Sequence, residues 1–109
     1  MPYNGQFKSG NIYIRKWIMT GGENIETHEH NFDHTTMVFT GSVIATTKTI
    51  SGDVVEQRID APGHLLIKKG VKHKFLALSD DTQLWCLFSH RDDQGEVTQE
   101  CRCFSEPYR

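Results

Sequence analysis

Residues 22–41 read GENIETHEHNFDHTTMVFTG, and the spacing of their histidines decides the fold. His28 and His30 lie two positions apart in a β-prone run, so both side chains point to the same face of a strand. Their Cα atoms are then about 6.5 Å apart, a spacing at which two imidazoles can meet one metal ion at about 2.0–2.1 Å. On a continuous strand His34 would lie about 13 Å beyond His30, so the chain must fold back between them. Residues 31–33 favour a turn there, which would place His34 at the start of the next strand, beside its partners.

The rest of the chain consists of short β-prone runs separated by turn residues. The runs are 11–19, 25–30, 34–40, 43–50, 54–59, 64–68, 73–78 and 83–89. Residues 51–53, Ser-Gly-Asp, form a good hairpin turn between two of them. Roughly eight short strands at near-regular spacing, with no helical period over three turns, predict an all-β antiparallel sandwich or barrel. We expect a single domain over residues 1–109, with 97–104 as a candidate last strand on the surface.

Charge and composition argue against several classes of protein. The formal net charge is −2, whereas a nucleic-acid binder normally has a basic stripe and a high pI. The short basic segment 68–74 is interpreted as a solvated loop. No apolar run approaches the about 20 residues of a membrane span, and the N-terminus does not resemble a secretory signal. We therefore expect a cytoplasmic protein that binds neither nucleic acid nor membrane.

The three cysteines are an odd number, which argues against a disulfide framework. Cys86 lies in an apolar run and is interpreted as a buried small hydrophobic residue. Cys101 and Cys103 could bind a metal or sense redox state. Two reduced thiols are the favoured interpretation, because no second cysteine pair completes a site.

The histidine segment resembles the first motif of the cupin superfamily. Gly22, five residues, His28-x-His30, three residues, His34, six residues and Gly41 reproduce its spacing. The motif spans about residues 22–41. Cupins usually have glutamate at the position of His34, so this chain departs from the common ligand set there.

A second segment, about residues 63–78, resembles the second cupin motif. It consists of Gly63 followed by Lys68-x-Gly70-x-x-His73. Cupins commonly have proline at the position of Lys68 and asparagine at that of Ala77, and the gap after Gly63 is one residue shorter than usual. These departures affect turn rigidity and local hydrogen bonding more than metal binding.

The resemblance covers residues 22 to about 78, just over half of the chain. It implies a double-stranded β-helix, or jelly-roll barrel, in a single domain. It also implies that one divalent metal ion is bound by four histidines, namely His28, His30, His34 and His73. Members of the family often dimerise through strands near the N-terminus. We therefore expect a homodimer, with the run 11–19 as a candidate interface.

Four neutral imidazoles would leave a divalent ion with its full charge of +2, whereas three histidines and a glutamate would leave +1. The more positive centre should attract an anionic or enolate-like ligand and make a bound water more acidic. Imidazole suits Fe, Mn, Ni, Cu and Zn, so the ligand type does not select the metal. An octahedral ion would keep two positions open for water, substrate or O₂.

Three functions remain open at this point. The favoured one is a metal-dependent, dioxygenase-like enzyme that acts on a small anionic or chelating organic molecule. A non-redox isomerase or lyase, with the metal as Lewis acid, and a small-molecule binding or sensing module are the alternatives. The catalytic residues are unknown. Candidate acid–base groups are Tyr13, Glu29, Lys68 and His90.

The walls of the predicted pocket follow from strand parity. Phe75 and Ala77 share the parity of His73 and are expected to line the pocket. For the strand 83–89, both alternating faces are apolar, so its inward face stays open. His64 and His90 lie outside the motif positions and are interpreted as surface or packing residues.

Overall fold

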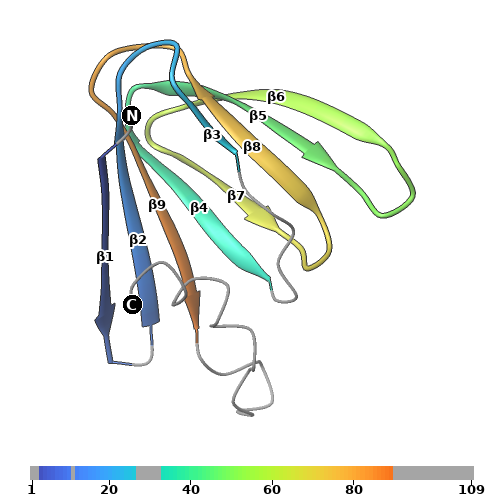
Figure 1. Cartoon of the computed structure of the whole chain (residues 1–109), viewed down its shortest axis with the longest axis horizontal. Helices are drawn as coiled ribbons and strands as arrows, with labels where there is room; N and C mark the ends of the chain where they lie inside the picture. Colours follow the sequence, from blue (N-terminus) through green and yellow to red (C-terminus); the bar gives the residue numbers. More distant parts are fainter. Residues whose placement is uncertain (1–2, 11, 27–32, 90–109) are drawn as a thin grey trace.

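The computed structural model describes residues 3–10, 12–26 and 33–89. Within these ranges the chain forms nine strands and no helix (Figure 1), so the prediction of an all-β chain is confirmed. The strands are β1 (Tyr3–Ser9), β2 (Ile12–Met19), β3 (Asn24–Glu26), β4 (His34–Thr40), β5 (Ser42–Lys48), β6 (Val54–Asp60), β7 (Gly63–Ile67), β8 (Lys72–Ala77) and β9 (Thr82–Ser89). The described ranges contain no helix that is long and apolar enough to cross a membrane.

Seven of the eight predicted runs form strands, and the described part of the eighth, residues 25–26, lies in β3. The rest of that run, 27–30, and the candidate last strand 97–104 lie outside the described residues. β1 is an additional strand that the sequence does not predict. Its sequence, YNGQFKS, is polar, contains a glycine and shows no clear alternation of apolar residues. It is a strand because it pairs with β2 along its whole length, from Tyr3 opposite Ile18 to Ser9 opposite Ile12. Tertiary pairing here overrides a weak local preference.

The strands form two antiparallel sheets that face each other (Figure 1). The five-stranded sheet has the order β1-β2-β9-β4-β7, and the four-stranded sheet has the order β3-β8-β5-β6. After the β1–β2 hairpin, the chain passes from one sheet to the other at nearly every connection, with the β5–β6 hairpin as the exception. This alternation is the connectivity of a jelly roll, an architecture of two packed antiparallel sheets.

The core lies between the inner faces of the two sheets. Burial alternates along the strands, and β9 shows the pattern in full, with every second residue from Thr82 to Phe88 buried. The buried apolar cluster comprises Met19, Ile25, Val38, Val43, Ala45, Ile67, Phe75, Ala77 and Leu84. Both sheets contribute to it, so side chains fill the barrel interior between these residues.

The motif glycine Gly41 makes the tight turn between β4 and β5. Its φ is +79°, in the left-handed region that L-residues with a side chain rarely adopt. A Cβ built on it would lie 2.9 Å from the Cα of Thr82. Gly41 is therefore required both for its backbone conformation and for the close approach of the β8–β9 turn.

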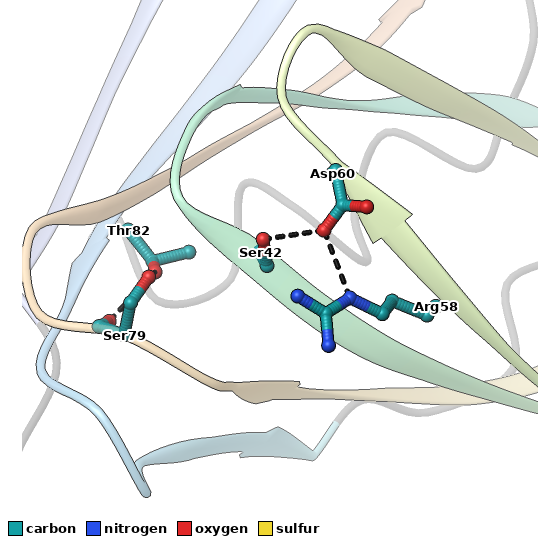
Figure 2. A network of polar contacts seen from close by, with 5 residues as sticks. All are labelled: Ser42, Arg58, Asp60, Ser79 and Thr82. Atoms are coloured by element: carbon teal, nitrogen blue, oxygen red, sulfur yellow. Dashed lines mark hydrogen bonds and ion pairs between the residues drawn. The ribbon is translucent and has the colours of Figure 1, made fainter.

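Polar contacts secure the same end of the barrel (Figure 2). The hydroxyl of Ser42 donates to Asp60 Oδ1 at 2.6 Å, and Arg58 Nε donates to the same oxygen at 2.9 Å. The hydroxyl of Thr82 donates to the carbonyl of Ser79 at 2.7 Å. The hydrogen bond from Ser42, and then the one from Arg58, lower the pKa of Asp60. The Ser42–Asp60 contact joins the start of β5 to the end of β6, and the Thr82–Ser79 contact closes the turn before β9. Both lie near Gly41, at the end of β4 that is farther from His34.

The expectation that residues 68–74 form a solvated loop is wrong for their second half. The backbone N–H of Val71 closes a turn on the carbonyl of Lys68 at 3.2 Å, and β8 begins at Lys72. The lysines of β8 are exposed because they alternate with His73 and Phe75, which are buried. The lysines therefore lie on the outer face of β8, and the opposite face of the strand packs into the core.

Candidate metal centre

His34 and His73 are brought together across the barrel, although they are far apart in the sequence. His34 is the first residue of β4 in the five-stranded sheet, as predicted, and His73 lies in β8 of the four-stranded sheet. Both are buried, with relative exposures of 3% and 4%. Their ring centroids are 4.9 Å apart, and the ring planes make an angle of 50°. The two sheets thus place two imidazoles side by side inside the molecule.

The separation of the two rings suits ligation of a single ion. A ring bound at about 2.0–2.1 Å has its centroid about 3.2 Å from the metal. Two rings with centroids 4.9 Å apart are therefore close enough for one ion to lie within reach of both. The pair can therefore supply two neighbouring ligands.

The other two predicted ligands, His28 and His30, lie outside the described residues, and so does Glu29. Within the described ranges, no group of three or more His, Cys, Asp or Glu side chains could hold a metal ion. His34 and His73 are thus the part of the predicted ligand set for which a position is established.

The ring of His73 is held in one orientation by the backbone. Its Nδ1 lies 3.2 Å from the carbonyl oxygen of Val71, to which the Nδ1–H can donate. In that tautomer Nε2 carries the lone pair that a metal needs. Burial lowers the pKa of His73, and the carbonyl of Val71 partly opposes this. Near neutral pH His73 is therefore a neutral imidazole, the form that coordinates metals.

Asp33 anchors the chain immediately before His34. Its Oδ1 accepts the backbone N–H of Lys69 at 2.8 Å, and its Oδ2 lies 3.1 Å from the ammonium of Lys68. These contacts, the backbone one foremost, hold the pKa of Asp33 below its ordinary value. Asp33 thereby links the start of β4 to the turn that leads into β8, so one carboxylate ties together the segments that carry His34 and His73.

The inner face of β9, which the sequence left open, carries Leu84, Cys86 and Phe88. Cys86 is buried, as predicted, and its Sγ lies 3.4 Å from the hydroxyl oxygen of Thr36. Burial raises the pKa of the Cys86 thiol, so it stays protonated. Phe75 and Ala77 are buried on the same face of β8 as His73, as predicted from their parity. The described surroundings of the histidine pair are thus largely apolar.

One charged residue on this side of the sheet was missed. Arg15 lies in β2 opposite Cys86 and shares the parity of the buried Met19. Its Nε donates to Asn4 Oδ1 at 3.0 Å, and its guanidinium carbon lies 4.7 Å from the ring centroid of Trp17. Both alternating faces of IYIRKWIM are largely apolar, so the sequence alone does not identify Arg15 as inward-facing, and the burial of Met19 in the structure does.

The remaining acid–base candidates, and the histidines and cysteines outside the two motifs, lie in different parts of the chain. The ring of Tyr13 stacks on Phe88 with centroids 5.1 Å apart, on the inner side of the five-stranded sheet. Lys68 lies on an exposed turn beside Asp33, and His64 is exposed on β7 opposite Met37, which agrees with a surface role. His90, Cys101 and Cys103 lie outside the described residues.

Comparisons with known proteins give matches in structure. No protein-family model matches the sequence, and no curated protein does. The oxalate decarboxylase of Lactobacillus farciminis, solved as a formate complex, superimposes with a TM-score of 0.73 at 17% identity. The match covers 81% of this chain and 28% of that one, so this chain spans little more than a quarter of the enzyme's length.

Two smaller proteins match over most of their own length. KdgF from Halomonas sp. gives a TM-score of 0.64 at 18% identity, covering 79% of this chain and 76% of that one. An RmlC-like cupin with a double-stranded β-helix fold from Methanocaldococcus jannaschii gives 0.68 at 12% identity, covering 82% and 80%. At such low identities the likeness concerns the fold. The chain has the double-stranded β-helix fold of the cupin superfamily.

Proposed function

We propose that this protein is a metal-binding cupin that holds one divalent ion with His28, His30, His34 and His73. The observation that carries the proposal is the juxtaposition of His34 and His73, two buried imidazoles 4.9 Å apart from opposite sheets. The first motif places His28 and His30 immediately before His34 in the sequence. An ion of Fe, Mn, Ni, Cu or Zn fits this donor set.

The chain's own residues prepare the site in three ways. The carbonyl of Val71 orients His73, and Asp33 fixes the start of β4 relative to the turn before β8. Phe75 and Phe88 are buried and exclude water from the interior. When bound, the metal would supply Lewis acidity and open coordination positions. Four neutral ligands would leave a bound divalent ion with its full positive charge.

This charge supports a small anionic or chelating organic substrate. We propose a metal-dependent enzyme of the dioxygenase-like kind as the leading assignment. A non-redox isomerase or lyase, with the metal as Lewis acid, is the second candidate, and the lyase is supported by the name of one structural neighbour, an oxalate decarboxylase. A small-molecule binding or sensing cupin without catalysis is the third.

Elemental analysis of the purified protein and of single variants tests the metal site. We expect about one metal ion per chain in the wild type and a loss of most of it in His34→Ala and in His73→Ala. His64→Ala is the matched control, because His64 is exposed on the outer side of β7 and should leave the metal content unchanged. Full metal content in both the His34 and His73 variants would show that the four-histidine site is wrong.

Activity measurements separate the three functions. Oxygen uptake by the metal-loaded protein with enolisable or dicarboxylic acids supports the dioxygenase. Turnover that is unchanged under anaerobic conditions supports the lyase or isomerase. Tight ligand binding without product supports the sensing module, and any turnover excludes it.

We also propose that the protein is a homodimer joined through the outer face of the five-stranded sheet. This face exposes about half of Phe7, Ile12, Phe39 and Leu66. The rings of Phe7 and Phe39 flank Trp85, with centroids 6.0 and 4.7 Å away. Four half-exposed large side chains present roughly 350 Å², and neighbouring half-buried apolar residues extend the patch toward the about 800 Å² per partner of a standard interface. β2, the predicted interface strand, lies within this face.

Light scattering after size-exclusion chromatography tests the dimer. We expect a mass of two chains for the wild type and of one chain for the double variant Phe7→Ser and Phe39→Ser. The matched control is Val55→Ser, an exposed apolar residue of the other sheet, which should stay dimeric. A monomeric wild type at micromolar concentration would exclude this interface.

A further inference from the structure

Two turns at one end of the four-stranded sheet meet outside the barrel and form an open pocket. The turn at residues 49–53 joins β5 to β6, and the turn at residues 68–71 joins β7 to β8. The side chain of Ile50 reaches across to Gly70, where a built Cβ would lie 2.9 Å from Ile50 Cδ1. The pocket between them has a volume of about 250 Å³ and is lined by Lys48, Thr49, Ile50, Gly70 and Lys72.

The pocket lies on the opposite side of the sheet from the candidate metal centre. Thr47 pairs with His73, which faces the interior, and Lys48 pairs with Lys72, which is exposed. Because successive residues of a strand point to opposite faces, Lys72 points out of the barrel where His73 points into it. The pocket is therefore a separate site, and its ligand need not approach the metal.

The two lysines place two positive charges at directly opposed positions of the sheet. Side chains so opposed have Cβ atoms about 4.5–5.5 Å apart, and like charges there destabilise the pairing. Among the residues that the structure describes, no carboxylate lies within 4.0 Å of either ammonium. Asp53, the acid of the adjoining turn, instead accepts a hydrogen bond from the hydroxyl of Ser51 at 3.2 Å. The two ammonium groups thus form a local doubly positive site on a chain whose net charge is negative.

We infer that this pocket binds a doubly charged oxyanion, either inorganic phosphate or the phosphate group of a small monoester. A dianion matches the two ammonium charges, whereas a single carboxylate would leave one of them uncompensated. The lysine ammonium attracts phosphate as a point charge, so the bidentate hydrogen-bond geometry of an arginine guanidinium is not needed here. Ile50 is 84% exposed and forms an apolar wall beside the lysines, which suits the organic part of a monoester. The pocket exceeds the about 30 Å³ share of one water several-fold, so either ligand fits.

A residue-resolved NMR titration with sodium phosphate at constant ionic strength tests the site. We expect saturable shifts of the backbone amides of Thr49, Gly70 and Lys72. Lys48→Gln and Lys72→Gln should each weaken the binding about tenfold or more, since each removes a charged hydrogen-bond donor. The matched control is Lys74→Gln, on the same strand and face but outside the pocket, which should bind as the wild type does.

The outcomes that overturn the inference are specific. Shifts spread over all surface lysines, or binding unchanged in Lys72→Gln, would mean general charge screening. Saturable shifts confined to residues around His34 and His73 would place the anion at the metal centre instead. Either result leaves the metal-content test of the proposed function unaffected.

A second titration separates the two sources of the oxyanion. If the pocket serves a monoester, glycerol 3-phosphate should bind several-fold tighter than inorganic phosphate, and Ile50→Ser should remove that difference. Equal affinities that do not change in Ile50→Ser assign the pocket to inorganic phosphate. Absence of saturation by either compound up to about 10 mM would refute the site.

Discussion

The two faces of the β5–β8 pair put opposite demands on neighbouring residues. On the inner face, His73 is buried and neutral, and its ring centroid lies 4.9 Å from that of His34. On the outer face, Lys72 is exposed, charged and opposed to Lys48. One residue along a strand separates an environment that excludes charge from one that concentrates it. A strand can therefore serve two unrelated ligands, provided that its register does not slip.

The largest expected effect is a difference in stability between substitutions at Phe75 and at Lys74. Phe75→Ala removes a buried ring from the inner face and should lower the free energy of unfolding by about 3–5 kcal/mol. Lys74→Ala, one position away on the outer face, should change it by no more than about 0.5 kcal/mol. Urea unfolding of both variants measures the contrast, and comparable losses would contradict the assignment of the two faces.

Metal removal should give the next effect. A ligand present at about 100 times its Kd stabilises the folded state by about 2.7 kcal/mol. We therefore expect a chelator to lower the Tm of the wild type by several degrees and to leave that of His73→Ala unchanged. Lys72→Gln should respond to the chelator as the wild type does. A chelator effect that persists in the His73 variant would argue against this residue as a ligand.

The smallest effect concerns Asp33 and depends on pH. The folded-state pKa of Asp33 lies below its ordinary value of 3.8, so its contribution is present above that value and is lost as the pH falls through the lower folded-state pKa. Because the carboxylate is partly exposed, the contribution should be about 1 kcal/mol or less. Asp33→Asn should therefore be slightly less stable than the wild type at pH 7 and converge with it as the pH falls through the folded-state pKa of Asp33. A constant difference across this range would show that the Asp33 charge is not responsible.

The sequence predicted the barrel because short β-prone runs recur at near-regular spacing between turn residues, and because its histidines lie at the spacing of the first cupin motif. It also predicted that His34 begins a strand, because a continuous strand could not bring it near His30. It left the inward face of β9 undecided, because both Trp85 with Leu87 and Cys86 with Phe88 are apolar. Only the packing against the opposite sheet shows that Cys86 and Phe88 turn inward.

Other features depend on contacts that no local pattern encodes. β1 is a strand because β2 pairs with it, and its own residues give little indication of this. The lysine pocket exists because the side chain of Ile50 meets Gly70, twenty residues along the chain in a different turn. The short basic run 68–74 favours a solvated loop, whereas its second half belongs to β8, in which every second residue faces the core.

The repeated passage of the chain between the two sheets also has a kinetic consequence. His34 and His73 meet only after strands far apart in sequence have paired, because β4 and β8 lie in different sheets. Antiparallel folds dominated by such non-local pairing typically fold in milliseconds to seconds, since loop-closure entropy is lost before the contacts form. The pair of imidazoles should therefore come together late in folding, so the metal ion proposed above should slow unfolding rather than initiate folding.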